Sequence, residues 1–193
     1  MLLCFFTSLI NGYSQEECGS ETPSNYQTYE SESFNRSTSE TYCINVSFRI
    51  MRNNDGTNVA INPSIIPQIM TQLNTYFNPH GIYLKQLGTY DFINNTNFNN
   101  NISPNTKPAN IPNSINIFYV KSLQYSGIAF GSALYAKIRG SSNPNPTTAH
   151  EIGHILNLMH TWECTKMPVP PCVDNPLNTS QCGSKGDQIC DTP

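Results

Sequence analysis

The sequence predicts an α+β domain with two main helices. Alternating or continuous apolar residues predict strands at 43–51, 82–87 and 114–120, and helical periodicity predicts helices at about 63–78 and from His150 onwards. With 193 residues, the chain has room for one domain with a proper core and a short appendage, but not for two full domains.

The N-terminal segment has the pattern of a secretory signal peptide. Residues 1–10 are an apolar run too short to span a bilayer as a helix, and polar residues follow from Asn11. We therefore expect a signal peptide over 1–14 and a secreted, extracellular protein. Residues 15–42 are rich in Ser, Thr, Glu and Gln, which predicts a polar N-terminal segment or pro-region. The formal net charge of −3 provides no basic surface, and we expect neither nucleic acid nor a membrane as partner.

Cysteine usage indicates an oxidising compartment. Removing Cys4 with the signal peptide leaves six of the seven cysteines, an even number that predicts disulfides. The rival interpretation is a second, cysteine-ligated zinc site, but no pair has the Cys-x-x-Cys spacing. A third role, as a thiolate that holds zinc in a precursor, is open to Cys18 and Cys43. The disulfide candidates are Cys18, Cys43, Cys164, Cys172, Cys182 and Cys190.

Local signals justify the first strand and the first helix. The segment 43–51 places Ile, Val, Phe and Ile at every second position, as a half-buried strand does. Residues 53–56, Asn-Asn-Asp-Gly, supply a turn because these residue types tolerate a positive φ. Asn62-Pro63 then combines a good N-cap with a proline at the first helical position. Gly81 is expected to end the helix.

The second half of the domain contains a long connection and two further extended segments. Residues 94–113 are rich in Asn and Pro with little to pack, which predicts a surface loop long enough to have a functional role. The apolar run 114–120 predicts a strand. Glycines within 126–136 mark places where a bulge or a close backbone approach can occur. The Ser-, Asn- and Pro-rich segment 141–146 separates this region from the last helix.

The segment 150–160, His-Glu-Ile-Gly-His-Ile-Leu-Asn-Leu-Met-His, carries three of the four histidines. On a helix, His150 and His154 project from one face at a spacing that a zinc ion can bridge, and the apolar residues 152, 155 and 156 fall on the opposite side. Catalytic zinc commonly has three protein ligands and an open fourth position. Glu151, on the adjacent flank, is placed to take a proton from zinc-bound water and pass it to a leaving amine. The chemistry indicated is metal-assisted hydrolysis of an amide.

His160 can join the other two histidines only if the helix stops. On an unbroken helix it would lie about 120° round the axis from His154. Asn157 is placed to end the helix, because Asn adopts the left-handed conformation more readily than most residues other than Gly. Two alternatives remain: Asp174 as a more distant third ligand, and a Thr148–Glu151 capping box with the histidines merely exposed.

The pattern His150-Glu151-x-x-His154-x-x-Asn157-x-x-His160 resembles the metzincin zinc signature. His160-Thr161 and the segment 186–193, Gly-Asp-Gln-Ile-Cys-Asp-Thr-Pro, are similar to the pappalysin branch of these peptidases, the M43 family. The resemblance covers roughly residues 43–193. It implies a metzincin-like, twisted mixed sheet, an N-terminal catalytic subdomain with the zinc helix over 43–161, and a Cys-rich start of a C-terminal subdomain over 162–193.

The same resemblance implies the roles of several residues. Zinc would be held by His150, His154 and His160, with Glu151 as general base, and an edge strand near 127–135 would pair with an extended substrate. Family members carry calcium near the cleft, bound by hard oxygen ligands. Three residues of this chain could supply such oxygens, although ordinary loop polarity explains their side chains equally well. The calcium candidates are Asp187, Asp191 and Thr192.

Two departures from the family pattern affect the expectation. Asn157 replaces the usual glycine, which its tolerance of the left-handed conformation permits. The sequence ends at Pro193 before a methionine-containing turn, and Met167 is not expected to supply one, so we expect a truncated C-terminal part.

The sequence therefore predicts a secreted zinc-dependent endopeptidase that acts on protein or peptide substrates by glutamate-assisted attack of zinc-bound water. The alternative is a secreted, disulfide-stabilised zinc-binding module that is catalytically silent because its C-terminal half is absent.

Overall fold

A computed structural model describes residues 41–103, 106–142, 146–158 and 160. The predicted signal peptide, nearly all of the polar segment 15–42 and the Cys-rich segment 162–193 lie outside these residues.

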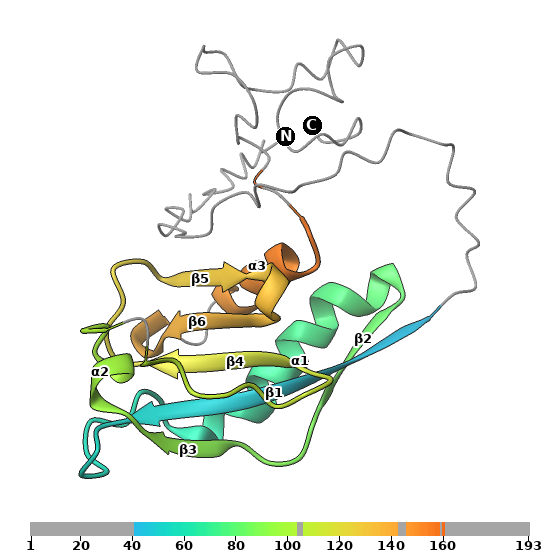
Figure 1. Ribbon diagram of the computed structural model, residues 1–193. Coiled ribbons are helices and arrows are strands. Elements are labelled where there is room, and N and C mark those ends of the chain that lie inside the picture. The colour runs from blue at the N-terminus through green and yellow to red at the C-terminus, as the bar shows by residue number, and fades with distance from the viewer. Residues whose placement is uncertain (1–40, 104–105, 143–145, 159, 161–193) are drawn as a thin grey trace, which may run out of the picture.

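The described residues form an α+β fold around one mixed sheet of six strands in the order β2-β1-β4-β6-β5, with β3 also paired to β1 (Figure 1). β1 is long enough to pair first with β2 and then with β3 along one edge, while β4 lies along its other edge. All pairings are parallel except that of β5 with β6, so an antiparallel strand lies at one end of the sheet. The strands are β1 (Tyr42–Arg52), β2 (Ile82–Gln86), β3 (Asp91–Asn94), β4 (Ile115–Val120), β5 (Gly127–Phe130) and β6 (Tyr135–Arg139).

Two helices, α1 (Ile66–Phe77) and α3 (Thr147–Ile155), cover one face of the sheet. α1 lies near β2 and α3 lies over β5 and β6 (Figure 1). Alternate residues of β1, β4 and β6 meet the apolar faces of both helices, and Leu73 and Ile152 are buried there. The core is therefore formed by the apolar residues that recur at the strand period of two and the helix period of 3.6 in the sequence.

The start and end of the first helical segment follow the predicted local signals. Asn62 accepts a hydrogen bond from the Ser64 amide at 3.1 Å, but it caps a 3₁₀ turn, Pro63–Ile65, that leads into α1. After a second 3₁₀ turn, Asn78–His80, Gly81 has φ +75°, a conformation that glycine adopts without strain.

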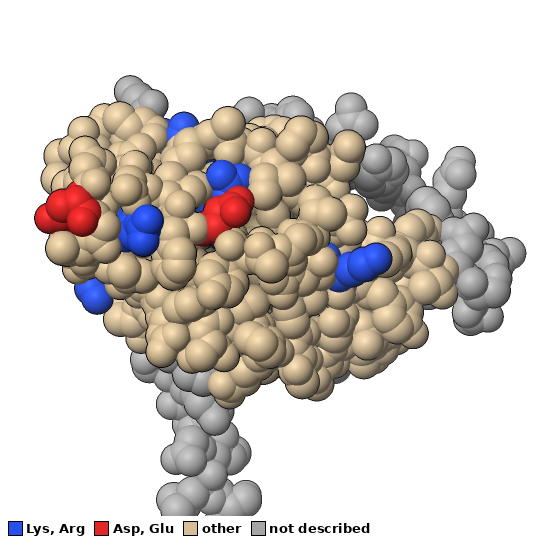
Figure 2. Space-filling model, turned by 90° about the horizontal axis from the view of Figure 1, so that it is seen from below, with Lys and Arg blue, Asp and Glu red and all other residues tan. Residues whose placement is uncertain are grey.

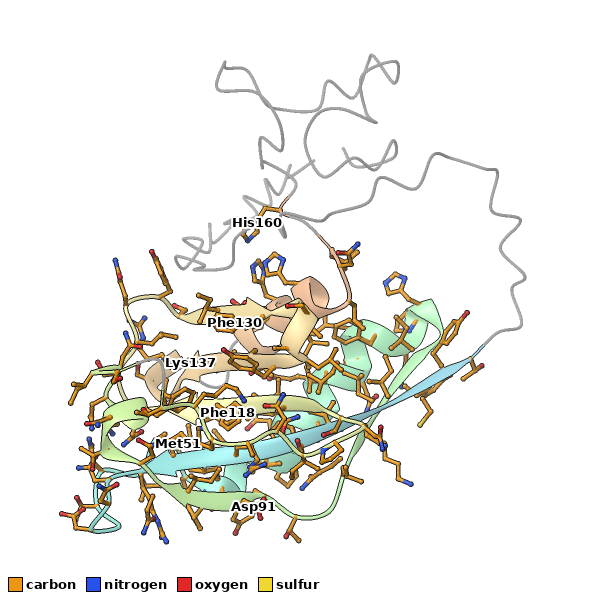
Figure 3. All side chains as sticks on the ribbon, viewed as in Figure 1. Met51, Asp91, Phe118, Phe130, Lys137 and His160 are labelled. Atoms are coloured by element: carbon orange, nitrogen blue, oxygen red, sulfur yellow. The ribbon has the colours of Figure 1, made fainter. Side chains whose placement is uncertain are left out.

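The prediction that 94–113 is a surface loop with little to pack was wrong for its first part. The segment contains the short helix α2 (Thr96–Asn99), and Phe98 and Asn99 are buried. Phe98 joins Met51, Phe118 and Val120 in a second apolar cluster on the other face of the sheet. Figure 3 labels Met51 and Phe118 of this cluster. The Asn-rich composition favoured a solvent-exposed loop, but the asparagines of this helix form specific hydrogen bonds within the protein. The Asn99 side-chain amide, for example, donates to the Asn58 carbonyl.

The predicted edge strand near 127–135 is also shorter than expected. β5 ends at Phe130, a 3₁₀ turn occupies Gly131–Ala133, and Tyr135 already belongs to β6, which lies between β4 and β5. Leu134 makes the corner with φ +50°.

The described surface carries few charges. The face shown in Figure 2 has only scattered Lys, Arg, Asp and Glu side chains. Arg49 and Asp91 form an ion pair, with Nε and Oδ2 3.5 Å apart, beside the second apolar cluster. Among the described helices, none combines the length and the apolar character that crossing a bilayer requires.

Candidate metal centre

The helix that carries the site, α3, is fixed to the sheet from its first turn. It starts at Thr147 after Pro146, and no side chain caps its N-terminus. The Thr148 hydroxyl instead shares a 3.0 Å hydrogen bond with the buried hydroxyl of Tyr119 on β4, and burial raises the pKa of Tyr119. The alternative that Thr148 and Glu151 form a capping box is therefore wrong, because Thr148 lies inside the helix and has another partner.

The apolar side of α3 was predicted correctly. Ile152 and Ile155 are buried in the main core, and Leu156 packs against it. This contact turns the opposite side of the helix, with His150 and His154, away from the sheet. The two histidines thus owe their position to core packing.

The helix ends as the sequence predicted, with Asn157 in the left-handed conformation at φ +72°. The Asn157 amide donates to the His154 carbonyl and the Leu158 amide donates to the Gly153 carbonyl, each at 2.9 Å. These two bonds form a Schellman motif, which satisfies carbonyls that the end of a helix leaves unpaired. The chain turns there, and His160 comes back toward the helix.

The three predicted histidines meet at one point. The Nε2 atom of His154 lies 3.0 Å from those of both His150 and His160, and the latter two are 3.2 Å apart. Among the described residues, these three form the group of His, Cys, Asp or Glu side chains that could hold a metal ion. His150 is exposed, His154 is intermediate and His160 is buried, so the group lies at the surface with one side in the protein.

A backbone carbonyl sets the orientation of the middle ring. The Nδ1 atom of His154 is 2.7 Å from the Leu158 oxygen, and because a carbonyl only accepts, Nδ1 carries the proton. In the neutral ring, Nε2 then presents a lone pair to the other two histidines. Such a hydrogen bond to the far nitrogen is the usual support of a metal-bound histidine. The sequence could not reveal this group, since it is a backbone carbonyl at one of the unspecified positions of the motif.

The electrostatics of the cluster favour neutral imidazole at His150. Desolvation by the surrounding protein, followed by the proximity of His154 and His160, lowers its pKa to about 4. His150 is therefore unprotonated near neutral pH even without a metal, although part of its surface is exposed. A neutral ring is the form that binds metal ions.

Glu151 lies beside the histidines in sequence but points into the protein. Its side chain is fully buried, and it packs against Gly127 of β5. The glycines of 126–136 were expected to allow a close approach, but the partner of Gly127 could not be predicted, because the contact joins segments far apart in the chain.

Several predicted site residues lie outside the part of the chain that the structure describes. The calcium candidates Asp187, Asp191 and Thr192, the alternative ligand Asp174, and five of the disulfide candidates lie outside the described residues. Cys43 is exposed at the start of β1. The calcium and disulfide assignments stay predictions.

Comparison with protein-family models and with curated proteins finds no match for the chain. The similarity to metzincins consequently depends on the motifs in this sequence alone.

Proposed function

We propose that the chain is a secreted, metzincin-like zinc endopeptidase of the pappalysin type. The observation that carries the proposal is the convergence of the three Nε2 atoms at separations of 3.0–3.2 Å, with Glu151 next to His150 on the same helix. Zinc–nitrogen bonds of about 2.0–2.1 Å in a tetrahedral arrangement place the nitrogens roughly 3.3 Å apart. The donor set also fits zinc, which binds neutral imidazole readily and commonly leaves its fourth position open in enzymes.

The proposed chemistry assigns one role to each part of the site. Zinc, when bound, supplies Lewis acidity, which activates water as a nucleophile and polarises a peptide carbonyl. The Glu151 carboxylate accepts the proton of the attacking water and delivers it to the leaving amine. Leu158 keeps the ring of His154 in the tautomer that leaves Nε2 unprotonated. These roles require no other side chain of the described residues to change its protonation state.

The position of β5 supports a peptide as the substrate. β5 is the terminal strand of the described sheet, antiparallel to its neighbour, and α3 packs directly against it. A terminal strand can bind an extended peptide through backbone hydrogen bonds. A peptide on β5 would lie close to Glu151, which contacts Gly127 in this strand.

One observation favours the alternative of a catalytically silent zinc-binding module. Glu151 has no exposed surface, whereas a general base has to reach the water that it deprotonates. Zinc binding and turnover must therefore be measured separately.

The test uses the purified full chain and its Glu151→Gln, His160→Ala and Asp174→Ala variants. We expect about one zinc per chain, cleavage of an unfolded fluorescent protein substrate, and loss of cleavage on chelation. Glu151→Gln should keep zinc and lose about 10²- to 10⁴-fold in activity, the usual contribution of a general base. His160→Ala should lose zinc, while Asp174→Ala should keep it.

The outcomes separate the candidates. Stoichiometric zinc without cleavage of any unfolded substrate supports the silent module. A Glu151→Gln variant that cleaves normally refutes the assigned base. Loss of zinc in Asp174→Ala but not in His160→Ala refutes the assigned ligand set.

A further inference from the structure

The contact between Gly127 and Glu151 leaves no room for a side chain on β5. A Cβ atom built on Gly127 would lie 2.5 Å from Oε1 of Glu151, 2.7 Å from its Cγ and 2.9 Å from its Cδ. All three distances are below normal van der Waals contact. The glutamate side chain therefore lies directly over the glycine and occupies the volume that any other residue at position 127 would fill.

Other glycines near the site are not under this constraint. A Cβ on Gly131, just after β5, would meet its nearest neighbour, the His154 carbonyl oxygen, at 3.5 Å. A Cβ on Gly153, within α3, would meet Leu158 at 3.5 Å. Both are ordinary contacts. Of these three glycines, only the one that faces Glu151 leaves no room for a side chain.

Glu151 has little freedom to avoid an added methyl group. Its side chain has no exposed surface, so it cannot simply turn into solvent. Its helix is also fixed on both sides of it, by the Thr148–Tyr119 hydrogen bond and by burial of Ile152. A larger residue at position 127 must therefore displace the carboxylate, move α3 away from β5, or do both.

We propose that Gly127 is a positioning residue: its lack of a side chain sets where the Glu151 carboxylate lies between α3 and the terminal strand of the sheet. This proposal rests on the function proposed above, since it concerns the proton-transfer group of that reaction. Gly127 has no side chain that could take part in the reaction. It acts through Glu151, by holding the carboxylate beside the strand on which a peptide would bind.

The steric part is tested with a double-mutant cycle on stability, using the full chain. Gly127→Ala should lower the melting temperature by roughly 3–6 °C, as overpacking does in a protein of this size. Glu151→Ala removes Cγ, Cδ and Oε1, the three atoms that the new methyl group would meet. In the Glu151→Ala background, Gly127→Ala should therefore cost little or nothing. Gly131→Ala is the matched control and should change the melting temperature only slightly.

The functional part is tested by separating kcat from KM at full zinc occupancy. Gly127→Ala should lower kcat by about 10- to 100-fold, the effect of a catalytic group displaced by about 1 Å, with nearly unchanged KM and zinc stoichiometry. In the Glu151→Gln background the same substitution should cause little further loss, because the carboxylate that it displaces is already gone.

Two results overturn the inference. One is an equal loss of melting temperature from Gly127→Ala with and without the Glu151 side chain, which would place the clash elsewhere. The other is a wild-type kcat in a Gly127→Ala protein that shows the coupled destabilisation. A wild-type protein that binds zinc but cleaves nothing refutes the proposed function instead, and the stability cycle still decides whether Gly127 sets the position of Glu151.

Discussion

Replacement of Asn157 tests whether the helix end builds the metal centre. Asn157 has φ +72°, and the turn at this residue brings the Leu158 carbonyl to His154 and the chain back to His160. Glycine adopts this conformation without penalty, whereas residues with a bulky Cβ do so at a cost of about 1–2 kcal/mol. We therefore expect Asn157→Gly to preserve the site and Asn157→Val to damage it.

The magnitude follows from the two ways in which a valine can be accommodated. Keeping the turn costs the left-handed penalty of about 1–2 kcal/mol. Giving up the turn loses the Leu158–Gly153 and Asn157–His154 backbone bonds, which contribute about 1 kcal/mol each. Either way the zinc-bound state loses about 1–2 kcal/mol. If the metal-free state relaxes, the dissociation constant for zinc rises about 5- to 30-fold, since each 1.4 kcal/mol is about tenfold.

The assay is competition for zinc between each variant and a chromophoric chelator near neutral pH. The matched control is Asn113→Val, because Asn113 also has a positive φ, +56°, but it lies just before β4, where its carbonyl accepts a hydrogen bond from the Asn45 amide. We expect it to lower the melting temperature without a comparable loss of zinc affinity. Wild-type zinc affinity in Asn157→Val, or a large loss in Asn157→Gly, would refute the role given to this turn.

Three further predictions concern the protonation of His150, the packing of Gly140 and the hydrogen bond that anchors α3. The pKa of His150 is about 4 in the folded protein and about 6.5 in the unfolded chain. The free energy of unfolding of the metal-free protein should therefore fall as the pH drops from about 6.5 to 4. His150→Asn should flatten this pH dependence, measured by urea unfolding. Gly140→Ala should lower the melting temperature strongly, because the added Cβ would overlap the Ala60 carbonyl oxygen. A normal melting curve would contradict this packing. Tyr119→Phe should lower the free energy of unfolding in urea by about 1–3 kcal/mol, because it leaves the buried Thr148 hydroxyl unpaired. Thr148→Val should then cost less in the Tyr119→Phe protein than it costs in the wild type. Additive losses would show that the two hydroxyls are not partners.

The elements that the sequence predicted are those whose signals are local. β1 alternates, α1 and α3 carry apolar residues at helical spacing, and β4 is a continuous apolar run that is buried along its whole length. Each pattern depends on one segment facing one core. The left-handed end of α3 was predictable for the same reason, because the need to stop the helix is a property of the spacing between His154 and His160.

The missed elements depend on partners that are distant in sequence. In α2, Asn95 caps the helix by accepting from the Phe98 amide, and Asn99 is buried because its side chain bonds the Asn58 carbonyl and the Lys121 amide. Asparagine, a residue type that usually indicates a loop, here provides side-chain hydrogen bonds that stabilise a short helix. The division of 126–136 into two strands likewise depends on Leu134, which adopts a positive φ that is not expected of a leucine.

The three histidines are held by restraints of different origin, which predicts how strongly each part of the proposed metal site depends on a bound metal. His150 and His154 are positioned by α3, which the buried residues Ile152 and Ile155 hold against the sheet whether or not an ion is bound. His160 depends on a turn of two backbone hydrogen bonds and on its proximity to the other two rings. In the metal-free protein the three imidazole nitrogens lie close together without a cation to offset their repulsion. Amide exchange should therefore accelerate on chelation in residues 156–160 while α3 stays protected, because opening the packed helix costs more free energy than opening the turn. Equal loss of protection in both segments would show that a bound metal, and not the core, holds α3 in place.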